Sequence, residues 1–374
     1  MFYAVIGAGM IGSAAARHLA EAGHDVILIG PSEPDDKSKH TGAFASHYDA
    51  GRITRGLATD PFWAQASLAS IARYRQIEAD SGISFYDDVG CLLAGPEGAK
   101  HLQDVGRVAT ELRIDAEHLS QKDMKDRFPL FAFSKDDIGY FETKNAGTIN
   151  PRALVAAQIK LAVSHGAKLL RAEAKALCER TSRLVIETSS GDIEADQVLI
   201  ATGGFAPNLI DGLNLRVYAR TVALFEVSEA EAQRLQKCPS MIYLDQDGND
   251  PYLLPPIRYP DGKFYLKLGG DPNDRHLAPH EFTEWFQSGG NPDVGAHLEA
   301  QMRARMPDLQ IGSVTTNACV TTFTDTGRPL IRRHSDRISL AVAGCGAGAK
   351  CSNELGRLGA ETLLKRRLPA WATQ

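Results

Sequence analysis

The first 30 residues constrain the fold of this chain more than any other stretch. An apolar run over 2–6 leads directly into Gly7-Ala-Gly-Met-Ile-Gly12, and an alanine-rich segment over 13–22 follows. The pattern G-x-G-x-x-G between a strand and a helix is typical of a dinucleotide-binding loop, where the helix N-terminus stabilises the phosphate charge. Residues 25–29 have the composition of the next strand, so the chain is predicted to begin with a β-α-β unit.

Each glycine of this loop has an expected task. Gly7 would make the tight turn, Gly9 would let the backbone approach a pyrophosphate, and Gly12 would let the helix pack closely on the sheet. We therefore expect the loop to hold the cofactor through five residues: Gly7, Gly9, Met10, Ile11 and Gly12. The alternative is a glycine turn without a ligand, which its place between a strand and a helix disfavours.

The acid that usually accompanies this loop is missing. In dinucleotide-binding folds an acidic residue about twenty positions further on holds the ribose. In this chain Gly30 occupies the corresponding end of the second strand. We expect Ser32 or Glu33, in the loop that follows, to contact the ribose instead.

Bulk properties narrow the class of protein. A length of 374 residues favours two domains, and a net charge of −5 gives no electrostatic case for nucleic acid. No apolar run is long enough to span a membrane, and the N-terminal run has no basic region before it, so we interpret it as a strand and expect a cytoplasmic protein. The six cysteines form no C-x-x-C pair and no zinc ligand set, so no metal is expected.

Two compositional types alternate along the chain. β-α patterns occupy the N-terminus, the region around 150–205 and the C-terminus, whereas an antiparallel pattern with a Pro260-Asp-Gly262 turn lies between about 215 and 310. The prediction is an α/β fold, α+β over the whole chain, with a discontinuous Rossmann-like nucleotide-binding domain over 1–50, 140–215 and 311–374. A substrate domain built on an antiparallel sheet would be inserted into it over 51–139 and 216–310.

Two further glycine turns follow predicted strands. The first contains Thr202, Gly203 and Gly204, and the second runs from Ala343 to Lys350 and opens the last helix. Small residues at such turns let backbone come close to a ligand. Backbone N–H groups at a helix start can also hydrogen-bond a ligand carbonyl and stabilise negative charge on it.

The three turns, in this order, resemble those of the FAD-dependent glycine/sarcosine/D-amino-acid oxidase family. The resemblance spans nearly the whole chain and includes Asp49-Ala-Gly-Arg-Ile-Thr-Arg55, Gly147-Thr-Ile-Asn-Pro-Arg152, Leu266-Lys-Leu-Gly269 and the segment from Cys319 to Pro329. Within the family, the motifs are most similar to those of monomeric sarcosine oxidases and their relatives that act on N-substituted amino acids. The resemblance implies FAD as the cofactor, contacted also by Arg52, Thr202, Gly203, Gly204, Gly346, Gly348 and Lys350.

The resemblance also implies a carboxylate-binding pair. Arg52 and Arg55 match an R-x-x-R segment of sarcosine oxidases that places two arginines at the active site, the second of which grips the substrate carboxylate. Lys350 matches the second carboxylate contact. Guanidinium forks bind carboxylates through two hydrogen bonds, so the chemistry agrees, and the alternative for the two arginines is a solvated basic stretch.

Two more residues receive roles through the resemblance. Lys267 matches a lysine that lies near the flavin and promotes its reaction with oxygen; the alternative is a strand lysine that points to solvent. Cys319 falls where monomeric sarcosine oxidases carry a thioether link to the flavin, and relatives with a similar segment bind FAD without a covalent bond. Both modes of attachment stay open. Arg52 and Lys267 are the expected catalytic residues.

The chain departs from sarcosine oxidases at three positions near the expected site. Ala347 and Asp271 replace two histidines, and Thr321 replaces a tyrosine. These departures put sarcosine itself in doubt as the substrate. Tyr252 and Arg258 flank the predicted pocket strand and are expected to contact a bulkier or more acidic substrate.

The expected function is FAD-dependent oxidation of the C–N bond of a small, N-substituted amino acid, with O2 as the acceptor and H2O2 as a product. Three alternatives stay open: a flavin dehydrogenase for D-amino acids or amines that reduces a carrier, an NAD-dependent dehydrogenase, and a non-catalytic nucleotide-binding regulator. The last would leave Arg55, Lys267 and Lys350 without a role. The expected partners are the substrate and O2, with no nucleic acid or membrane, and the protein would be a monomer or a homodimer.

Overall fold

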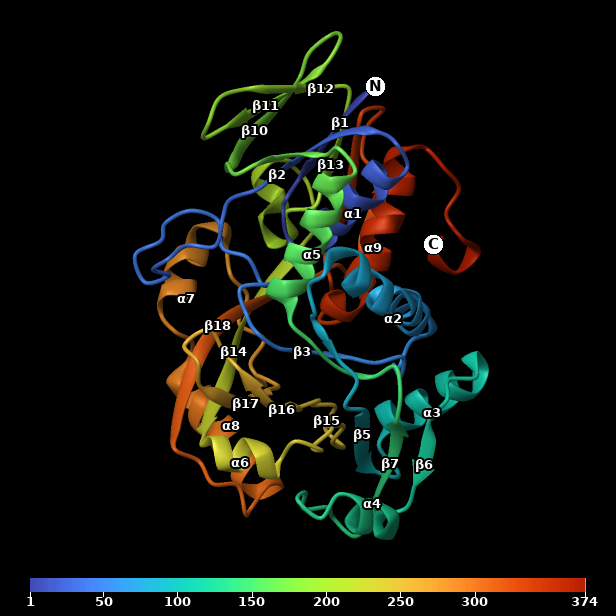
Figure 1. Cartoon of the computed structure of the whole chain (residues 1–374), viewed down its shortest axis with the longest axis vertical. Helices are drawn as coiled ribbons and strands as arrows, with labels where there is room; N and C mark the ends of the chain where they lie inside the picture. Colours follow the sequence, from blue (N-terminus) through green and yellow to red (C-terminus); the bar gives the residue numbers. More distant parts are fainter. Residues whose placement is uncertain (374) are drawn as a thin grey trace.

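The glycine loop near the start of the chain directly follows an interior strand of a six-stranded sheet. The computed structural model describes residues 1–373, and Figure 1 shows this sheet in the upper half of the molecule. The strand order is β19-β20-β13-β1-β2-β9, and all neighbours are parallel except β19 and β20. The strands are β1 (Phe2–Ile6), β2 (Asp25–Ile29), β9 (Lys168–Leu170), β13 (Gln197–Ile200), β19 (Leu330–Arg333) and β20 (Ile338–Val342).

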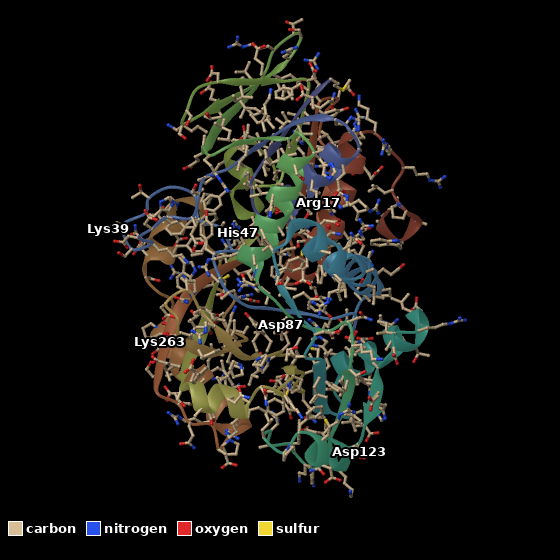
Figure 2. All side chains as sticks on the ribbon, viewed as in Figure 1. Arg17, Lys39, His47, Asp87, Asp123 and Lys263 are labelled. Atoms are coloured by element: carbon tan, nitrogen blue, oxygen red, sulfur yellow. The ribbon has the colours of Figure 1, made fainter. Side chains whose placement is uncertain are left out.

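Three helices pack side by side on this sheet: α1 (Met10–Glu21), α5 (Pro151–Ser164) and α9 (Gly348–Leu363). Gly356 of α9 lies directly against α1, because a Cβ atom there would be 2.6 Å from the Ala14 Cβ. Arg17, labelled in Figure 2, is buried between these helices and donates to Gln158 on α5 and to Asn353 on α9. The three helices therefore share a polar core as well as apolar contacts.

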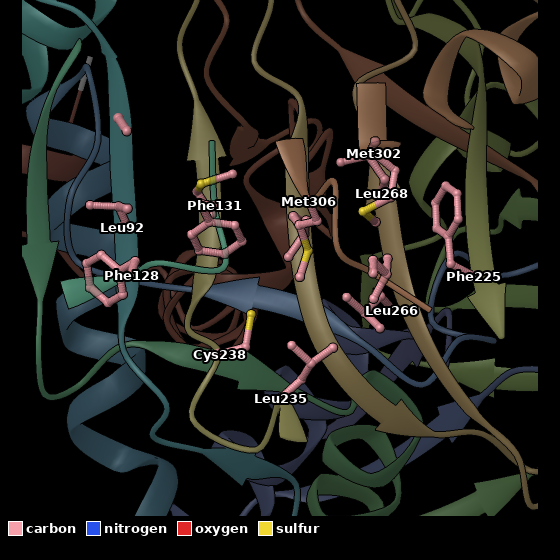
Figure 3. Close-up of a cluster of buried hydrophobic side chains, with 14 of the residues drawn as sticks. Leu92, Phe128, Phe131, Phe225, Leu235, Cys238, Leu266, Leu268, Met302 and Met306 are labelled. Atoms are coloured by element: carbon pink, nitrogen blue, oxygen red, sulfur yellow. The ribbon is translucent and has the colours of Figure 1, made fainter. Parts of the chain in front are cut away.

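The second large sheet has eight strands, in the order β18-β14-β17-β16-β15-β5-β7-β6, and fills the lower half of Figure 1. One of its faces packs on a large apolar cluster, part of which is drawn in Figure 3 with Leu92, Phe225 and Met302 labelled. The strands are β5 (Cys91–Pro96), β6 (Glu117–Leu119), β7 (Asp137–Glu142), β14 (Arg216–Val227), β15 (Ser240–Tyr243), β16 (Tyr252–Arg258), β17 (Phe264–Gly269) and β18 (Ser313–Phe323).

Smaller elements connect the two sheets. A three-stranded sheet of β3 (Arg52–Thr54), β8 (Gly147–Ile149) and β4 (Tyr86–Asp87) lies between them, and another joins β10 (Ala174–Glu179), β11 (Leu184–Thr188) and β12 (Ile193–Ala195). Helix α2 (Pro61–Ser81) packs on α5 and α9. The other helices are α3 (Lys100–Leu112), α4 (Gln121–Arg127), α6 (Glu229–Arg234), α7 (Phe282–Gln287), α8 (Pro292–Arg305) and the 3-10 turns at 203–208, 279–281 and 370–372.

The predicted α/β architecture is confirmed, with a Rossmann-like parallel sheet and an antiparallel sheet beside it. Two predicted boundaries cut through the antiparallel sheet. β18 pairs with β14 along its whole length, although its residues fall in the predicted 311–374 segment, and β7 spans the predicted boundary at 140. Within residues 1–373, no helix combines the length and apolarity needed to cross a membrane.

Candidate active site

A cavity of about 800 Å³ lies where the two large sheets meet. Its lining on one side comes from the glycine loop, the second glycine turn and the turn before α9. On the other side it comes from β14, β16 and β18, and from the segment around β3. The three glycine turns predicted to bind one ligand therefore line one cavity.

The glycine loop is shaped as the sequence predicts. Gly7 has a φ of 111°, and a Cβ atom there would lie 2.4 Å from the Ala201 carbonyl oxygen. At Gly12 the corresponding distance to the Gly7 carbonyl oxygen is 1.8 Å, so the start of α1 lies directly on the loop. The first four N–H groups of a helix have no partner within the helix, and α1 begins at Met10 on the edge of the cavity.

Gly30 has a steric reason to replace the usual acid. A Cβ atom at this position would lie 2.5 Å from the Ala8 backbone nitrogen and 2.6 Å from the Ala8 Cβ. Real Cβ atoms do not approach backbone that closely, so the loop and the end of β2 exclude any side chain at residue 30. Gly30 itself lines the cavity.

Neither Ser32 nor Glu33, the residues predicted to contact the ribose, lines the cavity. Both carboxylate oxygens of Glu33 accept hydrogen bonds at 2.7 Å from Arg152. Partial burial acts to raise the pKa of Glu33, but the hydrogen bonds and charge of Arg152 outweigh it and lower the pKa. The acid that does line the cavity near the end of β2 is Glu173, which follows the neighbouring strand β9.

Two buried hydroxyl groups support the assignment of the cavity to a polar cofactor. The Oγ1 atoms of Thr202 and Thr321 are buried and have no hydrogen-bond partner in the described part of the chain. Both residues line the cavity, together with Gly203, Gly204, Gly346 and Gly348. Buried polar groups are rarely left unpaired, so a ligand with hydrogen-bonding groups fits these walls. The residues present fit FAD in this respect.

Arg55 and Lys350, here called the cation pair, face the cavity side by side. Nothing in residues 1–373 accepts a hydrogen bond from the Arg55 guanidinium, although its Nε atom is buried. Lys350 is 3% exposed, and within residues 1–373 its Nζ atom donates one hydrogen bond, to the Arg55 carbonyl oxygen at 3.5 Å. Burial lowers the pKa of Lys350 to about 8, and the charge of Arg55 acts in the same direction.

A buried carboxylate stands behind the cation pair. Glu142 is 2% exposed and accepts hydrogen bonds from the backbone nitrogens of Gly56 and Leu57, at 2.9 and 3.0 Å. Burial raises the pKa of Glu142, while those two hydrogen bonds and the charges of Arg55 and Lys350 oppose the rise. Glu142 fixes the backbone directly after Arg55 and leaves the local charge at +1 when all three groups are ionised.

Arg52 and Cys319 meet on the cavity wall. The Arg52 Nη2 atom lies 3.8 Å from the Cys319 Sγ atom and 2.8 Å from the Ser46 carbonyl oxygen. Cys319 is a free, partly buried cysteine on β18, and its carbonyl oxygen accepts a hydrogen bond from Trp285. Both residues line the cavity, and their contacts with the cofactor stay a prediction.

Lys267 does not point to solvent, and it does not line the cavity. It is 1% exposed, and its Nζ atom lies 2.5 Å from the Asp49 carboxylate and 3.0 Å from the Gly51 carbonyl oxygen. The alternative prediction, that Lys267 points to solvent, is wrong. The lysine lies directly behind the wall that Arg52 and Cys319 form.

Of the two predicted substrate contacts on the pocket strand, the structure brings one to the cavity. Tyr252 lines it, and Gly269 on β17 makes room for the ring, because a Cβ atom there would lie 2.2 Å from it. Burial raises the pKa of Tyr252 to about 12, so the phenol stays protonated. The prediction for Arg258 is wrong: its side chain is 56% exposed, pairs with Glu229 and stacks on Phe264 away from the cavity.

The three departures from sarcosine oxidases all lie on the cavity lining. Asp271 accepts hydrogen bonds from the backbone nitrogens of Thr221 and Asn273, so its carboxylate closes a turn. Ala347 and Thr321 are small and leave space. His47, labelled in Figure 2, also lines the cavity, and burial lowers its pKa to about 4, so it is neutral.

Sequence reasoning missed Asp49, Glu142 and Glu173. Asp49 was visible only as part of a motif, and Glu142 lies in an unremarkable strand far from Arg55 in the sequence. No local pattern marks a carboxylate whose partners are distant. No cluster of potential metal ligands occurs in the part of the chain that the structure describes.

Comparison with known proteins agrees with this geometry. The monomeric sarcosine oxidase of Streptomyces avermitilis is 27% identical over 96% of this chain and 92% of its own length. The N-methyl-L-tryptophan oxidase of Yersinia pestis is 25% identical over 56% of this chain and 55% of its own.

Solved structures show the same fold. NikD, an amino acid oxidase essential for nikkomycin biosynthesis, superimposes with a TM-score of 0.75 over 97% of this chain and 93% of its own, at 21% identity. Amadoriase I of Aspergillus fumigatus, a fructosyl amine:oxygen oxidoreductase, superimposes with a TM-score of 0.76 over 99% of this chain and 88% of its own, at 16% identity.

One family model covers nearly the whole chain. It is described as FAD dependent oxidoreductase and matches residues 3–362, a range that includes all three glycine turns and both large sheets. The chain belongs to this family of FAD-dependent oxidoreductases.

Proposed function

We propose that this enzyme oxidises the C–N bond of a small amino acid, with a secondary, N-substituted amine as the preferred substrate and O2 as the electron acceptor. The observation that carries the proposal is the cation pair. Arg55 and Lys350 present two cations to the cavity, and the carboxylate of Glu142 behind them is held by backbone N–H groups. A buried cation without a partner is costly, so a ligand carboxylate fits this position.

The chemistry of the reaction is simple. The substrate loses a hydride equivalent from carbon and a proton from nitrogen to form an imine, which water hydrolyses to a carbonyl compound and an amine. FAD supplies the two-electron chemistry when it is bound, and O2 is reduced to H2O2. In this proposal Gly7, Gly9, Met10, Ile11, Thr202, Gly203, Gly204, Gly346 and Gly348 hold the cofactor.

The residues of the chain bind and orient the substrate. Arg55 and Lys350 hold its carboxylate, which fixes the reacting carbon relative to the cofactor. Tyr252 packs beside the substrate as a neutral phenol. Arg52 on the cavity wall and Lys267 directly behind it supply positive charge, which stabilises negative charge that develops during electron transfer to O2.

The relatives support an amine substrate, because their names give sarcosine, N-methyl-L-tryptophan and fructosyl amines as what those proteins oxidise. The small side chains at Ala347 and Thr321 support a substrate larger than sarcosine. Cytoplasmic location and a monomeric or homodimeric state belong to the same proposal. Size-exclusion chromatography with light scattering tests the oligomeric state.

The deciding experiment is a peroxide assay of the purified yellow protein over a panel of N-alkyl amino acids, cyclic imino acids, dicarboxylic imino acids and D-amino acids. Arg55→Met is expected to raise KM by about tenfold to a hundredfold, because a charge-assisted hydrogen bond contributes about 1.5–3 kcal/mol. Arg258→Met serves as the matched control and should leave KM unchanged.

Two results would contradict the proposal. A protein that oxidises the panel only with an artificial electron acceptor is a dehydrogenase, and a colourless protein that requires NAD has no flavin. Acid precipitation tests the attachment of FAD: flavin that stays with the pellet in the wild type, and not in Cys319→Ser, shows the thioether link.

A further inference from the structure

Behind the cavity wall, one carboxylate holds two cations that lie far apart in the sequence. The Oδ2 atom of Asp49 lies 2.5 Å from the Nζ atom of Lys267 and also accepts a hydrogen bond from Arg52. Its Oδ1 atom accepts from the Tyr259 hydroxyl at 3.0 Å and from the Ala50 backbone nitrogen at 2.7 Å. We call Asp49, Arg52, Tyr259 and Lys267 the Asp49 cluster.

The Asp49 cluster is nearly dry. Lys267 is 1% exposed, and the side chains of Asp49 and Arg52 are 14% and 16% exposed. Salt bridges in such surroundings cost desolvation energy, and replacement by apolar residues is often neutral for stability. Stability therefore gives no sufficient reason for four polar side chains here, and their place directly behind the cavity lining suggests a role in the reaction.

The groups that face Lys267 have opposing effects on the pKa of its ammonium group. Burial and the positive charge of Arg52 lower the pKa of Lys267 well below its ordinary value. Its other neighbours are the Cys319 thiol, whose charge would raise the pKa, and the Tyr252 ring, 5.9 Å from Nζ. Asp49 is the one acid whose carboxylate contacts the Lys267 Nζ atom in the described part of the chain.

A buried lysine without a counter-ion loses its proton near neutral pH. The roles assigned to Lys267 in the proposed function need the charged form, since only an ammonium can stabilise negative charge next to it. The same carboxylate also fixes the direction of the Arg52 side chain, whose other nitrogen reaches Cys319 on the cavity wall.

We propose that Asp49 is a positioning residue that keeps Lys267 protonated and holds Arg52 against Cys319, and so maintains the positive charge that serves the reaction with O2. The inference rests on the proposed function in one respect, the use of O2. Asp49 touches neither the cavity nor the substrate, and acts through the two cations that it holds.

The test compares Asp49→Asn, Asp49→Glu and the wild type. The first readout is the proton of Lys267 itself, followed in protein labelled with ¹³Cε-lysine, with the signal assigned by its absence in Lys267→Met. Removal of the carboxylate should move the titration midpoint of Lys267 to lower pH. The longer carboxylate of Asp49→Glu should restore most of the wild-type midpoint.

The second readout is the rate at which O2 reoxidises the reduced enzyme, measured in a stopped-flow instrument over a range of pH. Protonated Lys267 is lost as pH rises through its pKa, so a lower pKa means that the rate falls at lower pH. For Asp49→Asn we expect the fall to begin at least one pH unit earlier, which approaches a tenfold loss at a pH above both midpoints. The reduction of the enzyme by substrate should change much less.

Asp261→Asn is the matched control. Like Asp49, Asp261 accepts a hydrogen bond from a tyrosine hydroxyl, but it lies on the turn between β16 and β17, outside the Asp49 cluster. An unchanged Lys267 titration and O2 profile in Asp49→Asn would overturn the inference. If that variant does not fold, Asp49→Ser, which also lacks the carboxylate, takes its place. A Lys267 titration and an O2 profile at the wild-type position in Asp49→Ser would overturn the inference in the same way.

Failure of the proposed function is distinguishable from failure of this inference. A wild-type protein that makes no peroxide contradicts the proposed function. The lysine titration can still be measured in that protein, and it tests the control of Lys267 by Asp49 without any turnover.

Discussion

At the scale of single residues, the charge of Lys350 sets the pH range for substrate binding. The pKa of about 8 means that the side chain is a cation below this pH and becomes neutral above it. The binding of a carboxylate should therefore weaken as pH rises through about 8, by up to tenfold for each further unit.

A ligand without an amine isolates this titration. We expect the Kd of methoxyacetate, measured from the perturbation of the flavin spectrum, to rise with pH in the wild type. In Lys350→Met the Kd should be higher throughout and should not change over the same range. A wild-type Kd that is constant across this pKa would contradict the assignment of Lys350.

A second prediction at this scale concerns Gly30. The Cβ atom of Gly30→Asp would meet the Ala8 backbone, which cannot move without displacing the glycine loop. We expect the variant to lose stability at the upper end of the range of about 1–3 kcal/mol that overpacking costs, and to lose FAD on gel filtration.

Gly98→Asp is the control for this substitution, because nothing lies within 4 Å of a Cβ atom there. Its melting temperature and flavin content should equal those of the wild type. A stable Gly30→Asp enzyme that keeps its flavin would show that the usual acid is compatible with this loop.

Single residues also mark the limit of prediction from the sequence. The glycine positions follow from local backbone geometry, and the sequence therefore predicts Gly7, Gly9 and Gly12 with their tasks. Charge pairs such as Asp49 with Lys267 join residues more than 200 positions apart, and only the fold brings them together. The same reason explains why the expected substrate contact of Arg258 could not be checked from the sequence: only the fold shows that its side chain points away from the cavity.

At the scale of elements, we predict that the buried arginine between α1, α5 and α9 stabilises the packing of these three helices. Arg17 is 1% exposed and bonds to Gln158, Asn353 and Glu21. Arg17→Met removes the charged partner of all three groups, although Gln158 still donates to Asn353. Breaking a buried pair in this way costs about 3–5 kcal/mol. Urea unfolding of the holoenzyme measures the loss.

Arg303→Met is the matched control, since Arg303 pairs with Glu299 one turn away on an exposed face of α8. Such exposed pairs contribute about 0.3–0.5 kcal/mol. An Arg17 variant that is as stable as the Arg303 variant would show that the polar contacts between the three helices are dispensable.

The elements were easier to predict than their partners. The turn at Pro260–Gly262, for example, joins β16 to β17 as expected. The pairing of β18 with β14, nearly 100 residues earlier, cannot be read from periodicity, because every strand of this length offers the same hydrogen-bonding edge. The predicted boundary at 311 failed for this reason.

At the scale of the whole molecule, the cavity joins the two sheets. Its lining comes from the parallel sheet, from the antiparallel sheet and from the segment around β3, so a bound cofactor contacts all three. Removing FAD should therefore lower the thermal stability of the entire chain, and a ligand at one hundred times its Kd contributes about 2.7 kcal/mol.

Differential scanning calorimetry of Cys319→Ser with and without FAD tests this prediction, because the serine variant cannot form the thioether link. We expect one transition that moves to higher temperature with FAD. Two transitions, of which only one depends on FAD, would show that the sheets unfold independently.

The turn before α9 and the first turn of that helix carry two tasks within a few residues. In the proposed function, Gly346 and Gly348 shape the wall of the cofactor site and Lys350 binds the substrate carboxylate. The Tyr74 hydroxyl donates to the Lys350 carbonyl oxygen at 2.8 Å. A mutation that alters the carboxylate site from this side therefore disturbs the cofactor site as well. New substrate ranges, in evolution or in the laboratory, are therefore expected to arise from other parts of the lining, such as Tyr252 on β16 and His101 at the start of α3.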